Sequence, residues 1–298
     1  MKSLITLLLL VASVAHARDT PPPGRKPNIV VILADDLGYG DVHCFDPRHG
    51  KIPTPNIDKL AAQGMMFTDA HSGSAVCTPT RYGLLTGSYA WRSWLKNWVL
   101  LEYMPLLIEP QTPTIQRTLK ENGYTTGSIG KWHLGWGDEI NADWNRDVKP
   151  GPLETGFDYS YGIYWGVSVP GKPAWPAFIE NRHMVGLSDG DDINNPDTRQ
   201  RIIHDPHDTG LNLAAKATDF IRRNKKGPFF LYFPTVNVHL QYTPNTRFKS
   251  KLGDYADYVK ELDWIVSQVT DTLEREGIAD NTLIIFTSDN GSDCKNTP

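Results

Sequence analysis

Four short runs with the composition of β-strands, each followed at once by polar residues, restrict the fold of this chain more than any other feature. They occupy residues 28–33, 124–129, 228–233 and 282–288. The run at 28–33 is continuously apolar and rich in β-branched residues, which is typical of a strand buried on both faces of a parallel sheet. Helical patterns lie between the runs. The sequence therefore predicts an α/β fold with a mostly parallel sheet and helices on both faces.

Size and charge limit the class of protein. The 298 residues, with 40% hydrophobic and 21% charged content, are enough for one large domain with a substantial core. The formal net charge of −4 excludes an obvious polybasic surface for nucleic acid or for an anionic membrane. We therefore expect no nucleic-acid partner.

The first 17 residues have the pattern of a secretory signal peptide. Lys2 supplies the positive end, residues 4–14 form a short apolar core, and residues 15–17 read Ala-His-Ala, a cleavage pattern. Residues 18–26 contain three prolines in a row and predict a disordered lead-in. The apolar core is too short to span a bilayer, and no other run is long enough. We expect a secreted or periplasmic protein without a membrane span.

Capping residues and apolar periodicity place the helices between the strands. Thr54, Pro55 and Gly64 mark the start and end of one helix. The other expected helices cover residues 114–122, 211–224 and 255–276, and a short strand is expected at 65–70. The loop-rich region 135–210 is expected to shape substrate selection, and its His183, His204 and His207 have no assigned role.

Charged and polar residues follow the strands where α/β sheets bind their ligands. Asp35 and Asp36 come directly after the first run. Uncompensated charge beside a buried strand is costly, so a cation partner is preferred over a solvated acidic turn. Lys131 and His133 follow the second run, where they suit an oxyanion and a proton, respectively; the alternative is a turn lysine and a surface histidine.

The segment 75–87 contains the most specific pattern. Thr78 can cap a helix with Pro79 at its first position, and Leu84 and Leu85 would supply its buried face. Cys77 would then precede a helix N-terminus, which favours an anion. Arg81, one turn along, could bind a tetrahedral oxyanion with its planar fork. The alternative is an inert buried thiol.

Two motifs resemble a known family. Residues 77–81 read Cys-Thr-Pro-Thr-Arg and are followed by Leu-Leu-Thr-Gly at 84–87, which resembles the type I sulfatase signature. Residues 123–133 look like the second signature of that family. The resemblance runs from about Pro27 to the end and implies an alkaline-phosphatase-like sandwich, with residues 27–298 as a truncated N-terminal catalytic domain. The C-terminal subdomain and a catalytic lysine loop would be missing, and Lys295 lies too close to Asp289 to replace that lysine.

The resemblance also implies the chemistry. Such an enzyme cleaves sulfate esters, and a maturation enzyme first oxidises its cysteine, here Cys77, to formylglycine. Ca²⁺, or alternatively Mg²⁺, would complete the site. The implied metal ligands are Asp35, Asp36, Cys77, Asp289 and Asn290, and the implied catalytic residues are Cys77, Arg81, Lys131, His133 and His239. Without the resemblance, residues 289–291 would read simply as a turn.

Several alternatives stay open at this point. The same nucleophile and metal would suit a phosphonate monoester or phosphodiester hydrolase, and a truncated homologue could bind sulfated glycans without activity. The substrate alcohol could be aryl or sugar, and the sequence does not indicate an oligomeric state. A disulfide between Cys44 and Cys294 is one option, and two free thiols are the preferred interpretation. The Trp-rich residues 88–113 could bind a ring or sugar, or could pack in the core.

Overall fold

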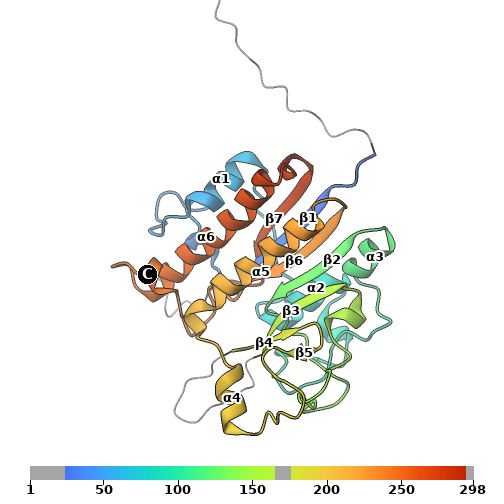
Figure 1. Cartoon of the computed structure of the whole chain (residues 1–298). Helices are drawn as coiled ribbons and strands as arrows, with labels where there is room; N and C mark the ends of the chain where they lie inside the picture. The colour runs from blue at the N-terminus through green and yellow to red at the C-terminus, as the bar shows by residue number, and fades with distance from the viewer. Residues whose placement is uncertain (1–23, 165–175, 293–298) are drawn as a thin grey trace, which may run out of the picture.

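The computed structural model describes residues 24–164 and 176–292, and a seven-stranded sheet forms the centre of this described part (Figure 1). The spatial order of the strands is β5-β4-β3-β2-β6-β1-β7. Five neighbouring strands, from β3 to β7, run parallel, whereas β4 and β5 are antiparallel. The predicted mostly parallel sheet is confirmed. The strands are β1 (Asn28–Ala34), β2 (Thr125–Gly130), β3 (Tyr159–Tyr164), β4 (Ala177–Glu180), β5 (His183–Met184), β6 (Phe229–Pro234) and β7 (Thr282–Ser288).

The strand register explains why the polar residues after the strands meet. β1 lies between β6 and β7, and Val30 of β1 pairs with Leu231 and Ile284. Because β3, β2, β6, β1 and β7 are parallel, their carboxyl ends all lie at one edge of the sheet. Ligand sites of open α/β sheets form at this edge.

Helices cover both faces of the sheet. Side chains alternate along β1, so that Val30 and Ile32 join one core and Val31 and Leu33 join the other. Figure 1 shows α5 and α6 side by side across one face, where α1 also packs. α2 contributes to the second core. The helices are α1 (Pro55–Gln63), α2 (Cys77–Thr86), α3 (Ile115–Glu121), α4 (Pro196–Ile202), α5 (Thr209–Asn224) and α6 (Asp254–Arg275).

Two local predictions were wrong. Residues 65–70 form no strand, and Met65 and Phe67 are exposed. A strand needs a partner for its backbone groups, and this segment pairs with no strand of the described chain. Thr54 precedes α1 but does not cap it with its side chain. Instead its hydroxyl donates to Asp58 and accepts from the backbone N–H of His43.

The edge strand β7 is only half covered. Ile284 and Phe286 pack against the core on one face, whereas Leu283 and Ile285 are exposed on the other. Side chains alternate along a strand, so a single face carries the exposed pair. The second face of the sheet is therefore incompletely covered at β7. No helix among residues 24–164 and 176–292 combines the length and apolarity needed to cross a membrane.

We expect Gly130→Ala to destabilise the fold. Gly130 ends β2 with φ +127°, and an added Cβ would lie 1.8 Å from the carbonyl oxygen of Pro234. This close approach allows the backbone N–H of Lys131 to donate to the same oxygen at 2.8 Å. The backbone conformation alone should cost roughly 1–3 kcal/mol of unfolding free energy. Urea unfolding measures the loss.

Gly227→Ala is the matched control, because Gly227 precedes β6 and a Cβ there meets open space. It should change the unfolding free energy by less than about 0.5 kcal/mol. Equal midpoints for the two variants would contradict the role given to the close approach at Gly130.

Candidate active site

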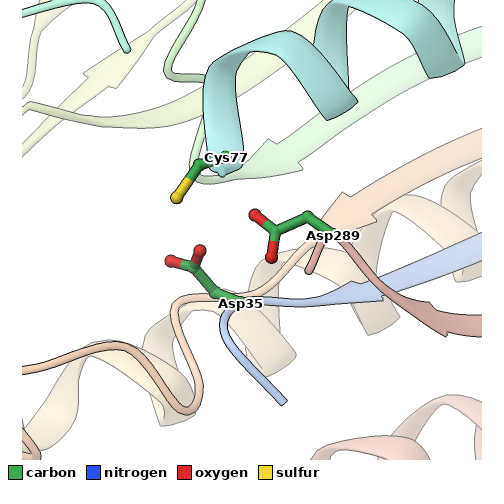
Figure 2. A group of neighbouring side chains, drawn as sticks. All are labelled: Asp35, Cys77 and Asp289. Carbon is green, nitrogen blue, oxygen red and sulfur yellow. The ribbon is translucent and has the colours of Figure 1, made fainter. Parts of the chain in front are cut away.

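The nucleophile candidate faces two carboxylates at the sheet edge. Asp35 follows β1, Asp289 follows β7, and Cys77 is the first residue of α2. Figure 2 shows the Cys77 sulfur at the beginning of α2, pointing toward both carboxylates. One ligand atom from each residue lies within 4.8 Å of the others, and all three residues are buried. The structure therefore brings together three of the residues predicted to hold a metal.

The start of α2 differs from the sequence prediction. The helix begins at Cys77, with Val76 as N-cap, so Thr78 is not the cap. The Thr78 hydroxyl instead donates to the carbonyl of His133 at 3.0 Å and accepts from the N–H of Leu100 at 3.1 Å. This hydroxyl ties the nucleophile helix to two loops of the site. Leu85 is buried as expected, whereas Leu84 is exposed.

The sequence suggested that Arg81 could bind an oxyanion, but in the structure its side chain points into the protein. Its guanidinium is fully buried and donates to Asp289 Oδ2 from Nε at 3.1 Å and from Nη2 at 2.7 Å. Nη2 also donates to Asp35 Oδ1 at 3.0 Å, and Nη1 donates to the carbonyl of Lys131 at 2.7 Å. Arg81 therefore holds the acidic residues in place from behind the site.

Lys131 contacts both Asp35 and Cys77. Its Nζ lies 2.6 Å from Asp35 Oδ2 and 3.6 Å from Cys77 Sγ, and the residue is buried. A compact ammonium at this point can compensate negative charge that develops on the atom attached to the Cys77 Cβ. The structure thus places the Lys131 ammonium beside Cys77, and its role toward an oxyanion stays a prediction.

The charges at this edge leave room for one more cation. Among the described residues, Arg81 and Lys131 are the permanent cations paired with Asp35 and Asp289, and Asp36 lies 3.7 Å from His239 Nε2. Burial would raise the pKa of Asp35, but Lys131 and Arg81 hold it below its ordinary value. Burial, together with Asp35, raises the pKa of Asp289 despite Arg81. A buried carboxylate with a raised pKa lacks counter-charge, and a hard divalent cation with oxygen ligands would supply it.

Asp36 and Asn290 lie beside this group. Asp36, with φ +59°, accepts from Asn290 Nδ2 at 2.5 Å, and its other oxygen lies 3.7 Å from His239 Nε2. Asn290 Oδ1 is buried and has no hydrogen-bond partner among the described residues. Such an amide oxygen is a suitable ligand for Ca²⁺ or Mg²⁺, because a buried acceptor otherwise remains unsatisfied. The residues present therefore fit the expected metal.

His133 presents a free acceptor at neutral pH. Its backbone has φ +52°, and its Nε2 donates to the carbonyl of Leu100 at 3.0 Å. Burial, together with Lys131 and Arg81, lowers the pKa of His133 well below its ordinary value. Nδ1 is then an unprotonated acceptor, buried and without a partner in the described part of the chain. This nitrogen can receive a proton.

The Cys77 thiol itself is poorly suited to attack. Burial raises its pKa to about 12, and the effect of Lys131 is opposed by Asp35 and Asp289. A thiol is nucleophilic as the thiolate, which would be scarce here at neutral pH. Cys44 forms no disulfide with a cysteine of the described chain, and Cys294 lies outside the described residues, so their possible pairing stays untested.

A cavity of about 550 Å³ opens above these groups. Asp35, Lys131, His133 and His239 contribute to its wall. Sequence reasoning assigned no role to the other polar and aromatic residues of this wall, although four of them fall in the region expected to shape substrate selection. They include Glu102, Trp136, Tyr164, Asp205, His207 and Gln241.

Glu261 is a further residue whose role the sequence did not reveal. It is fully buried on α6, where it accepts from the Asn245 N–H at 2.6 Å and from Asn237 Nδ2 at 3.3 Å. These two partners flank the loop that carries His239 and Gln241 along the cavity wall. Glu261 therefore fixes that loop to α6. A glutamate inside a long amphipathic helix gives no sequence signal for such a role.

We expect Arg81→Met to destabilise the chain strongly in chelator, because it leaves Asp35 and Asp289 as buried charges without their shared partner. Loss of one side of a buried ion pair costs about 3–5 kcal/mol. Adding Ca²⁺ should restore part of this loss in urea unfolding, since a cation compensates the same carboxylates. Arg222→Met, at an exposed position of α5, is the control and should change little. A loss that is identical with and without Ca²⁺ would contradict a shared cation site.

Glu261 should also give a pH dependence. Burial raises its pKa from 4.5 to about 7, so the folded protein retains a proton that the unfolded chain releases between these values. Stability should therefore fall as pH rises through this window, by up to about 3 kcal/mol. Glu261→Gln should lack this component, whereas the exposed Glu274→Gln on the same helix should keep it. The measurement is the free energy of unfolding in urea as a function of pH. If wild type and Glu261→Gln show the same pH dependence, Glu261 does not titrate in this way.

Comparisons with known proteins agree with this geometry. Residues 27–298 match the profile of the Sulfatase family. The chain is 36% identical to an N-acetylgalactosamine-6-O-sulfatase of Bacteroides thetaiotaomicron, over 98% of this chain and 65% of the relative. It is 31% identical to arylsulfatase A of Homo sapiens, over 96% of this chain and 54% of the relative.

Solved structures give the same result. A 6S-sulfatase structure, from a study of glycosaminoglycan metabolism by Bacteroides thetaiotaomicron, is similar with a TM-score of 0.82 at 36% identity. The alignment covers 90% of this chain and 63% of that one. A phosphonate monoester hydrolase of Agrobacterium radiobacter shares the fold, with a TM-score of 0.53 at 17% identity, covering 89% and 63%.

The chain thus spans less than two thirds of the length of these relatives. Within that span, the family profile and the 36% identity agree with the site at the carboxyl ends of the parallel strands. The chain belongs to the type I sulfatase family of the alkaline phosphatase superfamily.

Proposed function

We propose that this chain carries the hydrolytic site of a sulfatase, which cleaves R–O–SO₃⁻ with water to R–OH and sulfate. The observation that carries the proposal is the position of Cys77. It begins a helix, points at the Asp35 and Asp289 carboxylates, and lies 3.6 Å from Lys131 Nζ. Negative charge on an ester oxygen at this point would meet the helix N-terminus and the lysine together.

A divalent cation is part of the proposal. Asp35 and Asp289 would hold it, with Asn290 Oδ1 and Asp36 as the further oxygen ligands that the sequence predicted. When bound, Ca²⁺ or Mg²⁺ would polarise the sulfate and lower the pKa of a hydroxyl nucleophile. Cys77 would stand beside the cation in its modified form. Arg81 would act indirectly, by keeping Asp35 and Asp289 in place.

We also propose that Cys77 is converted to formylglycine. The unmodified thiol, with a pKa of about 12, is a weak nucleophile in this environment. Oxidation by a maturation enzyme would replace it with an aldehyde, whose hydrate offers oxygen nucleophiles. Lys131 Nζ would then lie beside these oxygens rather than beside sulfur.

His239 and His133 would each carry out one proton transfer. His239 lines the cavity at the end of the β6 loop, where it would give a proton to the leaving alcohol oxygen. His133 would accept a proton at Nδ1, since Nε2 already donates to the Leu100 carbonyl. The lowered pKa of His133 keeps this acceptor free at neutral pH.

A sulfated glycan is the substrate class that we propose. One relative is named N-acetylgalactosamine-6-O-sulfatase, and a similar structure at 28% identity, with a TM-score of 0.71, is titled as a complex with k-i-k-neocarrahexaose. The cavity wall of this chain combines Glu102, Asp205 and Gln241 with Trp136 and Tyr164. Polar groups with aromatic rings suit sugar hydroxyls and the apolar face of a pyranose.

The alternatives have less support. A phosphonate or phosphodiester substrate is supported here only by a shared fold with a structure at 17% identity. A binding protein without activity would not need the buried acceptor at His133 Nδ1 beside Lys131 and Cys77. We also propose export, on the basis of the signal-peptide pattern in residues 1–17, which lie outside the described part.

The proposal is tested by co-expression with a formylglycine-generating enzyme. We expect a Cys77 peptide about 18 Da lighter than its thiol form. The converted chain should hydrolyse sulfate esters at least a hundredfold faster than phosphonate esters, and Cys77→Ala should abolish this activity. Activity that is intact in the thiol form or in Cys77→Ala, or a preference for phosphonates, would overturn the proposal.

A further inference from the structure

A run of exposed aromatic residues lies outside the site already described. We call Tyr89, Trp91, Trp94, Trp98 and Tyr103 the aromatic strip; their exposed fractions range from 42% to 69%. The option that this region packs in the core is therefore wrong for these five side chains. Large aromatic side chains are usually well buried, and several exposed within 15 residues indicate a binding surface.

The aromatic strip adjoins residues of the cavity wall along the chain. Leu100, Leu101 and Glu102 line the cavity, and Trp98 precedes Leu100 by two residues, or about 7 Å of extended chain. Both the backbone N–H and the backbone carbonyl of Leu100 make hydrogen bonds. Its N–H donates to Thr78 on the nucleophile helix, and its carbonyl accepts from His133. A ligand on the strip would thus lie at a fixed distance from Cys77.

Local contacts also hold the outer rings. Tyr89 and Trp91 stack, with centroids 5.7 Å apart and an interplanar angle of 14°. Trp91 belongs to the short helix η2 (Ala90–Arg92), and Lys96 Nζ donates to the carbonyl of Trp91 at 3.3 Å. Little conformational entropy remains to be lost when these rings bind a ligand, which favours recognition of flat apolar surfaces.

Charge selects the ligand class. Arg92 lies 5.1 Å from the Trp91 ring centroid, and Lys96 follows four residues later, both exposed. Glu102 is the only acidic residue in the sequence from 88 to 103. Aromatic rings bind the C–H face of a pyranose, and neighbouring cations bind sulfate groups.

We propose that the aromatic strip binds successive sugar rings of a sulfated polysaccharide whose sulfated unit occupies the cavity. This inference rests on the proposed function, because it names the substrate as a polymer rather than a monosaccharide or an aryl ester. Trp98 binds the ring next to the cavity. Trp94 and the Tyr89–Trp91 pair bind rings further along, and Arg92 and Lys96 bind their sulfates.

The test measures binding without turnover. Cys77→Ala protein is titrated calorimetrically with disaccharides and hexasaccharides of 6-sulfated chondroitin and of carrageenan. We expect at least one hexasaccharide to bind about tenfold more tightly than its disaccharide. Adding Trp98→Ala should weaken hexasaccharide binding about three- to tenfold, the range for one aromatic contact. Adding Trp94→Ala should weaken hexasaccharide binding similarly and leave disaccharide binding unchanged, because a disaccharide does not extend beyond Trp98. Phe67→Ala, at a position exposed to 68%, is the matched control and should have no effect.

Four outcomes would overturn the proposal. The absence of length-dependent binding in both series, or an equal effect of Trp98→Ala and Phe67→Ala, would exclude a glycan surface. A dimer lost in Trp98→Ala on sedimentation would show that a second copy covers the strip, and binding to neutral lipid vesicles would show a lipid surface. If the converted wild type lacks sulfatase activity but length-dependent binding persists, the proposed function fails while the strip remains a glycan site.

Discussion

The structure depends on one buried guanidinium. Arg81 lies with no exposed surface between Asp35 and Asp289, which directly follow two neighbouring parallel strands, and it also donates to the carbonyl of Lys131. One side chain from α2 therefore joins the carboxyl ends of β1, β2 and β7. Three segments that are far apart in sequence are held at distances set by hydrogen-bond lengths. Cys77, one helical turn earlier, takes its position from the same anchor.

The buried carboxylates that Arg81 holds need further positive charge. Among the described residues, Arg81 and Lys131 pair with Asp35 and Asp289, yet burial and the neighbouring Asp35 still raise the pKa of Asp289. A divalent cation would satisfy the requirement and would add positive charge where a sulfate must bind. In the proposed function, the cation that compensates these carboxylates would also attract an anionic ester. The residues that stabilise this edge of the sheet would therefore also take part in the proposed chemistry.

The sequence predicted the sheet and most of the site because both follow from local patterns. Continuous apolar runs indicate buried parallel strands, and residues after such strands must meet, as Asp35, Lys131 and Asp289 do. The orientation of Arg81 could not be predicted, because helix spacing does not say whether a guanidinium points toward ligand or toward buried acids. Residues 65–70 have strand composition, but pairing depends on a partner strand. Glu261 and the cavity wall come from segments that only tertiary packing brings together.

The central claim is that the buried carboxylates form one cation site directly beside residue 77. A crystal structure of the chain grown with Ca²⁺, carrying formylglycine at position 77, tests it most directly. We predict one ion within about 2.3–2.6 Å of oxygens from Asp35, Asp289 and Asn290, with Arg81 still bound to both aspartates. An ion bound elsewhere at saturating Ca²⁺, with Asn290 Oδ1 still unpartnered between these acids, would contradict the account.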